Sequence, residues 1–368
     1  MATIRKRKRK DGTYGYTVQI RIMRDGVQAY QESQTFDRQQ VAKAWAARRE
    51  VELAQPGAIA KANRKGQLIR DIVDRYLEEY ERIRPLGKTK RATLKAIAGT
   101  WLGDVPDCEI TSQCLVEYAQ WRMSQAGGAV SAQTIGNDLS HMGAVLAVAR
   151  PAWGYEIDPH AIKDARTVLK KLGMVSRSKE RDRRPTLSEL DRLLAHFFEI
   201  LQRRPSSIQM PKVLAFAIYS TRRQDEICRI RWADLDRDGH RVLVRDMKNP
   251  GQKIGNNVWC HLPLEAMSII ESMPQVCEEI FPYNSDSIST SWTRACKFLE
   301  IQNLHFHDLR HDGVSRLFEM DWDIPRVASV SGHRDWNSMR RYTHLRGRGD
   351  PYLDWHWLPR ILASPEEI

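Results

Sequence analysis

The sequence of 368 residues lacks the features that define several protein classes. Its six cysteines are scattered and form no Cys-x-x-Cys pair, which argues against a zinc ribbon or a disulfide scaffold and fits a reducing cytoplasm. No apolar run approaches the ~18 residues that a membrane span needs. The basic N-terminus leads into Asp11-Gly12 rather than an apolar segment, so we do not expect a signal peptide. These absences predict a cytoplasmic protein with no membrane partner.

Two common catalytic devices are also missing. Gly87-Lys88-Thr89 lacks the leading glycine and the preceding strand of a phosphate-binding loop, so no bound nucleotide is expected. No group of aspartates and glutamates has the spacing of a two-metal nuclease. His307-x-x-x-His311 has the spacing of a zinc-ligand pair but lacks the glutamate of His-Glu-x-x-His. We therefore expect neither a metal ion nor a cofactor.

Positive charge is in excess. The chain has 58 lysines and arginines against 46 aspartates and glutamates, a formal net charge of +12. Such an excess favours a nucleic-acid partner, because lysines and arginines that neutralise phosphates release counterions. The length exceeds a single ordinary core and predicts two or three domains. A hydrophobic content of 42% indicates folded domains rather than disorder.

The highest density of functional side chains lies between His307 and Tyr342. An arginine beside histidines suits an anion that carries several oxygens, and a tyrosine downstream offers a nucleophile. Phosphate is the anion that would use all of these groups. A second cluster, about 85 residues upstream, follows the apolar run 213–219, which predicts a buried helix. In it, Arg223 and Glu226 are three residues apart and can share a helix face.

Together the two clusters resemble the tyrosine recombinase (phage integrase) family. Its motifs are Thr-Gly-x-Arg-x-x-Glu with a following Trp-x-Asp, then His-x-Leu-Arg-His, Gly-His and Tyr-x-His. The matching residues are Arg223, Glu226, Trp232, Asp234, His307, Leu309, Arg310, His311, Gly332, His333, Tyr342 and His344. Two residues depart from the pattern. Thr221 stands where the family usually has glycine, which bears on the local turn, and Ser331 stands where it usually has leucine.

The resemblance implies a DNA integrase that cuts and rejoins strands through a 3′-phosphotyrosyl intermediate. Positioned charge at the non-bridging oxygens is usually the largest catalytic term, and Arg223 and Arg310 can each donate two hydrogen bonds there. Tyr342 would attack phosphorus. Its reference pKa near ~10 requires a base or a strongly cationic site, and His307 is the best candidate for its proton.

Three further residues complete the expected site. His333 would hydrogen-bond the phosphate, and Glu226 would orient the arginines and His307. The family places a catalytic lysine on a hairpin, as the acid for the 5′-oxygen leaving group. Lys248, in the turn after a predicted strand, fits that position, although the nearby Lys253 could serve instead. The expected catalytic set is Arg223, Lys248, His307, Arg310, His333 and Tyr342.

Residues 1–55 are expected to form a small α+β domain. Alternating residues at 14–22 predict a strand, Asp25-Gly26 a hairpin turn, and 27–30 and 34–36 two further strands. Asp37 and Gln40 would form the capping box of a helix that ends near Leu53. The layout resembles the arm-binding N-terminal domain of larger integrases. The basic run before it is either a DNA-contacting arm or a solvated, disordered tail; it consists of Arg5, Lys6, Arg7, Lys8, Arg9 and Lys10.

The remaining chain is expected to be mainly helical. Amphipathic helices at 66–172 predict an all-α bundle, which resembles the family's core-binding domain. After a charged linker at 177–184, residues 185–348 would form a mainly α catalytic domain with a small antiparallel sheet from 240–246 and 258–262. The apolar tail 349–368 is expected to dock on another protomer, because exposed aromatic patches are unfavourable. The alternative is that it folds back on its own domain.

The resemblance further implies double-stranded DNA at attachment sites as substrate and a homotetramer on two duplexes. DNA-bending and directionality proteins are candidate accessory partners, and the protein would be nucleoid-associated. Such an enzyme would integrate, and could excise, a phage or mobile element. Two alternatives remain open: a type IB topoisomerase with the same chemistry, and a non-catalytic DNA-binding regulator on the same fold.

Overall fold

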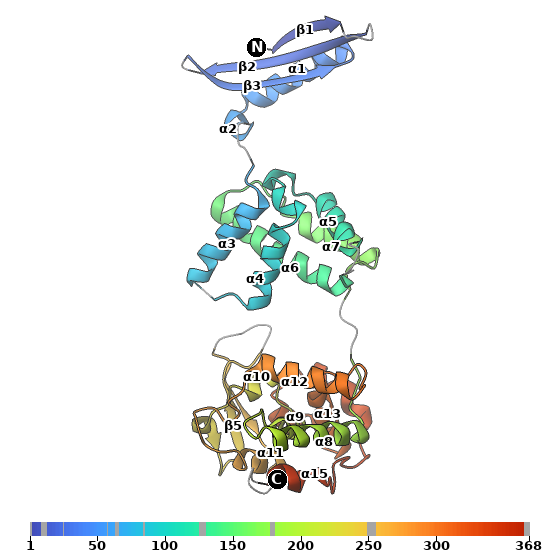
Figure 1. Ribbon diagram of the computed structural model, residues 1–368. Helices are drawn as coiled ribbons and strands as arrows, with labels where there is room; N and C mark the ends of the chain where they lie inside the picture. Colours follow the sequence, from blue (N-terminus) through green and yellow to red (C-terminus); the bar gives the residue numbers. More distant parts are fainter. Residues whose placement is uncertain are drawn as a thin grey trace. The chain divides into compact units, whose positions relative to one another are not determined.

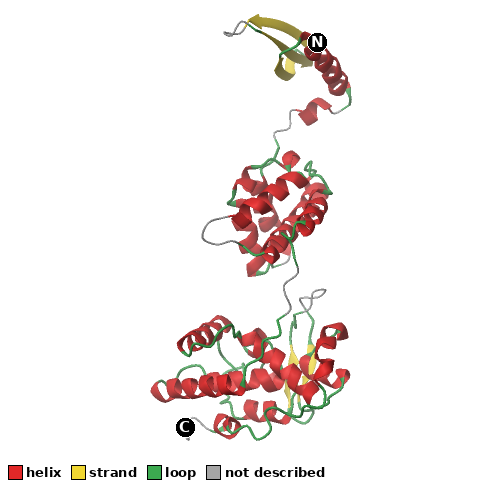
Figure 2. Cartoon of the chain, turned by 90° about the vertical axis from the view of Figure 1, so that its right-hand side faces the viewer, coloured by secondary structure: helices red, strands yellow, loops and turns green. Residues whose placement is uncertain are grey.

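The structure is a computed structural model of the chain. It describes residues 2–8, 13–24, 26–56, 58–62, 66–83, 85–124, 130–176, 181–248 and 255–363. The chain divides into two compact units, Met1–Lys179 and Glu180–Ile368 (Figure 1). Helices dominate both units, and each contains one three-stranded antiparallel sheet (Figure 2). This confirms the predicted combination of helices with small antiparallel sheets. No helix among the described residues is long and apolar enough to cross a membrane.

The first sheet is β1 (Ala2–Lys8), β2 (Tyr14–Arg24) and β3 (Val27–Phe36), in that order. Helices α1 (Gln39–Ala54) and α2 (Ala58–Ala62) follow it. Val18 and Ile20 on β2 are fully buried in a cluster with Ala42 of α1, because alternate residues of a strand share one face. The sheet and α1 therefore share one small core.

Two local predictions for this region were wrong, and the structure excludes the disordered-tail alternative for part of the basic run. Arg5 to Lys8 form the edge strand β1 rather than a disordered tail, while Arg9 and Lys10 lie outside the described residues. The two short strands expected after the hairpin are one strand, β3. The helix begins at Gln39 with Arg38 at its N-cap, one residue after Asp37, the predicted N-cap.

The rest of the first unit is a helical bundle. Its helices are α3 (Ile69–Ile83), α4 (Lys88–Ala98), η1 (Trp101–Asp104), η2 (Asp107–Glu109), α5 (Ser112–Ser124), α6 (Ala132–Trp153) and α7 (Ala161–Lys171). Thr111 and Ser131 cap α5 and α6, since they accept hydrogen bonds from backbone N–H groups of the first turns of these helices. Helix α7 was not predicted as a separate helix; its buried residues Ala161, Ala165 and Leu169 lie four apart on one face.

The second unit contains a sheet and several short helices. Its elements are α8 (Leu187–Arg203), α9 (Met210–Ser220), α10 (Gln224–Ile227), η3 (Trp232–Asp234), β4 (Leu235–Asp236), β5 (Arg241–Val244), β6 (Val258–His261), α11 (Leu264–Glu271), α12 (Ser285–Phe298), α13 (Phe306–Glu319), α14 (Ile324–Ser331), η4 (Trp336–Leu345) and α15 (Trp357–Leu362). The predicted pairing of β5 with β6 is confirmed. A capping box of Thr186 and Glu189 opens α8.

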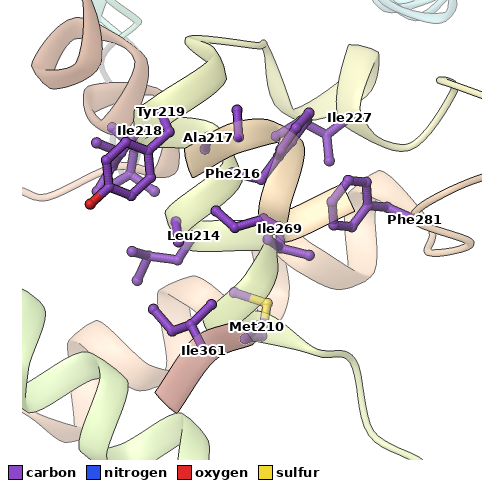
Figure 3. Close-up of a cluster of buried hydrophobic side chains, with 14 of the residues drawn as sticks. Met210, Leu214, Phe216, Ala217, Ile218, Tyr219, Ile227, Ile269, Phe281 and Ile361 are labelled. Carbon is purple, nitrogen blue, oxygen red and sulfur yellow. The ribbon is translucent and has the colours of Figure 1, made fainter. Parts of the chain in front are cut away.

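Helix α9 forms the centre of this unit. All of its 11 residues are buried, as the apolar run predicted. Figure 3 shows the side chains of α9 beside Ile269 of α11, Phe281 and Ile361 of α15. A helix buried on every side fixes the elements around it, and the functional residues follow directly at its C-terminus.

The C-terminal tail packs on the same unit. Tyr352, Trp355 and Trp357 are buried in the cluster that contains α9. The ring of Trp357 stacks on Phe198 at 5.6 Å, and its Nε1 donates a hydrogen bond to Asp191 at 2.8 Å. These aromatic side chains are covered without another protomer, and docking of the tail on a second protomer stays a prediction. The alternative, folding back on the chain's own domain, is what the structure shows for residues up to 363.

Candidate active site

The site begins where α9 ends. Thr221 has a left-handed backbone conformation, with φ of 57°. A β-branched residue seldom adopts this conformation, so the turn that glycine would make freely is made here at a conformational cost. Helix α13 crosses close by: a Cβ on Gly313 would lie only 2.0 Å from the carbonyl oxygen of Ile218. This approach of two backbones lets Arg310 of α13 donate a hydrogen bond to the carbonyl of Thr221.

Three arginines surround one buried carboxylate. Arg223 donates to Glu226 at 2.7 Å, and Arg222 lies 3.6 Å from the same side chain. Burial raises the pKa of Glu226, but Arg222, Arg310 and Arg223 more than offset this and lower it to about 2. Three guanidiniums against one carboxylate leave an excess of positive charge, which suits an anionic ligand. The contact expected between Arg223 and Glu226 is present.

Arg310 and His333 are in contact. Nη2 of Arg310 lies 3.3 Å from Nε2 of His333 and donates to the carbonyl of Ser331 at 3.0 Å. Burial, followed by Arg310 and Arg223, lowers the pKa of His333 to about 3, so the imidazole is neutral at pH 7. Because a guanidinium can only donate, we assign Nε2 as the acceptor and Nδ1–H as the donor to the Ser331 hydroxyl at 2.7 Å. Ser331, a departure from the family pattern, thus orients His333.

Tyr342 is held by a different histidine from the one expected. It lies on η4, 8% exposed, with its ring stacked on Phe318 at 5.9 Å. Its hydroxyl is 2.7 Å from Nδ1 of His311. His307, the predicted proton acceptor, packs edge-on against His311 with ring centroids 4.9 Å apart. The sequence signal for His311 was its place one helical turn after His307, on the same face of α13.

Both histidines beside the tyrosine favour their neutral forms. Burial lowers the pKa of His311, and the charge of Arg341 lowers it further. Desolvation lowers the pKa of His307, and His311 and Arg310 lower it further; because His307 is an exposed residue, the shift is smaller than it would be in a closed site. A neutral imidazole can accept a proton, so His311 is chemically suited to its contact with the phenol.

Comparison with known proteins identifies this region. Residues 186–348 match the Phage integrase family. They belong to that family. The resemblance seen in the sequence is therefore confirmed, and the match covers the arginine cluster and Tyr342.

Relatives extend the similarity along the chain. A shufflon-specific DNA recombinase of Escherichia coli is 30% identical over 245 residues, which are 65% of this chain and 59% of that protein. The chain therefore spans less than two thirds of this relative. A lambda integrase dimer bound to a COC′ core site matches with a TM-score of 0.62 over 95% of this chain and 97% of that chain, at 19% identity. A lambda integrase tetramer bound to a Holliday junction matches with a TM-score of 0.58, over 90% and 95%, at 18% identity. At these identities the structures show a shared fold.

The charged segment before the integrase domain is part of the site's support. Arg181 binds Asp308 through two bonds of 2.6 and 2.7 Å, and Arg184 binds Asp312 at 2.6 Å. Both partners lie on α13, next to His307 and His311. The segment from 181 onward was predicted to be linker, and that prediction was wrong. Charge alone did not reveal it, because the paired carboxylates lie more than 120 residues away.

The same segment reaches the nucleophile. Arg341, the neighbour of Tyr342, forms an ion pair with Asp182 and donates to the carbonyl of Arg181 at 2.9 Å. A cavity of about 460 Å³ lies here, and its lining includes His311 and Tyr342. The tyrosine, its histidine and the start of the integrase domain therefore share one local structure.

Of the two candidate lysines, the structure describes one. Lys248 follows β5 and is described, whereas Lys253 lies outside the described residues. Among the residues that the structure describes, no three His, Cys, Asp or Glu side chains could together hold a metal ion.

Proposed function

We propose that this protein is a site-specific DNA recombinase that integrates, and can excise, a phage or mobile element through a 3′-phosphotyrosyl intermediate. One observation carries the proposal. Helix α13 contributes Arg310 to the arginine cluster and His311, the next residue, to the hydroxyl of Tyr342. A single rigid element thus links the groups that would bind a phosphate to the group that would attack it.

The proposed reaction is a transfer of one ester bond. Tyr342 loses its hydroxyl proton to His311, which His307 supports from the adjacent turn. The phenolate oxygen bonds to phosphorus while the bond to the 5′-oxygen breaks, and Lys248 protonates that oxygen. Arg223 and Arg310 stabilise charge on the non-bridging oxygens. The bond energy is retained in the phosphotyrosine, so the reverse attack by a 5′-hydroxyl rejoins the strand without ATP.

The protonation states support these roles. The low pKa of Glu226 keeps it ionised beside the arginines. Burial, Arg223 and Arg222 lower the pKa of Arg310 to about 9, which leaves it charged at neutral pH. A buried, charged arginine cluster attracts phosphate strongly because little water competes with it. His333 would donate a hydrogen bond to the phosphate from Nε2 after a change of tautomer, in which the Ser331 hydroxyl donates to Nδ1 and Nη2 of Arg310 donates to the ligand instead.

Residues 1–55 are proposed to be a second, arm-type DNA-binding domain. Strand register puts one set of side chains on the sheet face opposite α1: Thr3, Arg5, Arg7, Thr17, Gln19, Arg21, Gln31, Ser33 and Thr35. None is acidic. Thr17 and Thr35 bond across the strands at 2.9 Å, and Arg21 donates to Gln31 at 3.4 Å. A sheet face that carries arginine and hydroxyl side chains suits a DNA groove. Arg5 and Arg7 would then contact DNA from β1.

The remaining parts follow the same proposal. Residues 66–172 would be the core-binding domain and 185–348 the catalytic domain, acting on double-stranded attachment sites. Lambda integrase, which shares the fold, was solved as a tetramer bound to a Holliday junction. We propose a homotetramer on two duplexes here as well, with accessory proteins that bend DNA or set direction.

A DNA duplex nicked near the crossover tests the proposal. The wild type should form a covalent complex that survives denaturant, and Tyr342→Phe should form none while still binding DNA. Tyr219→Phe is a matched control, because the Tyr219 hydroxyl is buried with no hydrogen-bond partner among the described residues. An adduct that persists in Tyr342→Phe would assign the reaction to another residue. Binding without any adduct in the wild type would favour a non-catalytic regulator.

A further inference from the structure

The hairpin that carries Lys248 does not keep its regular pairing up to that residue. The β5–β6 ladder ends at the pair Val244 and Val258. Lys248 is four residues beyond Val244. Between them, Asp246 has a left-handed backbone with φ of 47°, which turns the chain out of the strand. Something other than the ladder must therefore hold the backbone that leads into Lys248.

Asn256 holds it at two points. The Met247 N–H donates to the main-chain carbonyl of Asn256 at 2.8 Å. The side-chain Nδ2 of Asn256 donates to the Met247 carbonyl at 2.6 Å. That carbonyl belongs to the peptide group between Met247 and Lys248. Because a peptide group is planar, fixing its oxygen fixes the direction in which Lys248 begins.

This contact is buried. Asn256 and Met247 are each 2% exposed. The other side-chain atom of Asn256, Oδ1, is buried with no hydrogen-bond partner among the described residues. A buried amide with one unsatisfied oxygen is unfavourable compared with an apolar side chain of the same shape. An apolar side chain could not make the hydrogen bond from Nδ2 to the peptide before Lys248, and this bond is what the asparagine supplies.

Met247 connects the hairpin to His333. Gly332 has φ of 70° and immediately precedes His333. A Cβ on Gly332 would lie 2.6 Å from Cε of Met247 and 2.7 Å from its Sδ. Only glycine leaves room for this contact. The residue clamped by Asn256 is therefore packed against the backbone that positions His333 in the arginine cluster.

We propose that Asn256 is a positioning residue for Lys248, which it aims at the leaving 5′-oxygen through the Met247–Lys248 peptide. This inference rests on the proposed function, in which Lys248 donates a proton to that oxygen as the phosphorus–oxygen bond breaks. Without the Asn256 amide, the peptide can rotate and the ammonium is less often in place. Attack by Tyr342 and charge stabilisation by the arginines do not depend on this bond.

The test compares two leaving groups in Asn256→Leu, which keeps the approximate volume and removes the donor. Cleavage of an ordinary nicked substrate should slow by roughly ten- to a hundredfold, part of the effect of a general acid. A substrate with sulfur in place of the 5′-bridging oxygen releases a thiolate, which needs no acid, so the variant should cleave it at the wild-type rate. Asn256→Asp, which cannot donate when ionised, should behave in the same way.

Two controls separate the inference from the function on which it rests. Gln202→Ala, which removes an exposed amide on α8 outside the hairpin, should cleave both substrates like the wild type. Lys248→Ala should be slow on the oxygen substrate and restored on the sulfur substrate. If sulfur fails to restore Lys248→Ala, the acid of the proposed function is wrong. If sulfur restores Lys248→Ala but both Asn256 variants stay slow on both substrates, Asn256 only maintains the fold and the inference is overturned.

Discussion

The arginine cluster and the nucleophile segment are attached to the same helix but are held in different ways. Arg222 and Arg310 are buried, and their guanidiniums donate to main-chain carbonyls of separate elements, among them those of Ser220, Val330 and Ser331. Tyr342 lies on a 3-10 helix and is held at its hydroxyl by one neutral histidine.

This difference separates two catalytic tasks. Stabilising charge on a phosphate requires donors that are fixed before the ligand arrives, because reorganising them during the reaction would cost free energy. A nucleophile must instead approach the phosphorus and remain bonded to it. Substitutions in the arginine cluster are therefore expected to lower the cleavage rate strongly and the DNA affinity only weakly. In the nucleophile segment, the cleavage rate is expected to depend on the hydrogen bond between Tyr342 and His311.

The largest effect should come from the cluster. Arg310→Ala or Arg223→Ala should slow cleavage by a factor on the order of 10² or more, the loss expected when a transition-state donor is removed. DNA affinity should fall much less, because many other lysine and arginine side chains would contact the phosphate backbone of the DNA. Single-turnover cleavage and binding, measured side by side, check this. Arg231→Ala, a partly exposed arginine that pairs with Glu278, is the control. Equal losses in rate and affinity would reduce the two arginines to phosphate anchors.

The tyrosine contact gives the next prediction. His311→Gln should slow cleavage by roughly 10²-fold, within the range of general-base catalysis. His307→Gln should have a smaller effect, since His307 packs against the ring of His311, which contacts the phenol. Single-turnover rates on the nicked duplex distinguish them. If the His307 variant is slower, the contact between His311 and Tyr342 describes only the DNA-free protein, and the original assignment of the proton to His307 is restored.

Motif spacing predicted the residues that lie on one element. Arg310 and His311 are neighbours on α13, and Arg223 is three residues from Glu226, so their proximity does not depend on the rest of the fold. Tertiary contacts were out of reach. Arg222 occupies a variable position of the motif, yet it is fully buried because carbonyls from distant segments satisfy it. Its role could not be inferred from residue type alone.

The same reasoning explains the errors at the edges of domains. β1 contains the sequence Arg5-Lys6-Arg7-Lys8, which has no alternation of apolar residues, and it becomes a strand by pairing with β2. The apolar tail was recognised as needing cover, but the sequence could not say which surface covers it. Periodicity identifies a buried face; the partner of that face follows only from the folded chain.

The tail now predicts an effect on stability. Asp350, just before the tail's aromatic residues, binds Arg316 of α13 through two bonds of 2.7 and 2.6 Å and so anchors the segment after Tyr342 in cis. Trp357→Ala should lower the free energy of unfolding by about 3–5 kcal/mol, the usual cost of removing a buried aromatic side chain. Leu353→Ala, 74% exposed, should change it by less than about 0.5 kcal/mol. Urea unfolding measures both. An unchanged stability with a loss of cooperative assembly on DNA would instead place this residue in a contact between protomers.

The smallest effect should appear as a pH dependence of stability. The pKa of His333 is about 3 in the folded protein and about 6.5 in an unfolded chain. Between these values the unfolded state binds more protons, so the stability from neutral His333 is complete above about pH 6.5 and is lost as the pH falls towards 3. At pH 5.5 the loss should be about 1.4 kcal/mol, one pKa unit below the unfolded value. Urea unfolding of wild type and His333→Gln at pH 7.5 and 5.5 isolates this term, since His307 and His311 shift in the same direction in both proteins. If the two proteins lose equal stability over that interval, His333 is not held neutral by its burial and by Arg310, and the cluster is less firmly fixed than its contacts indicate.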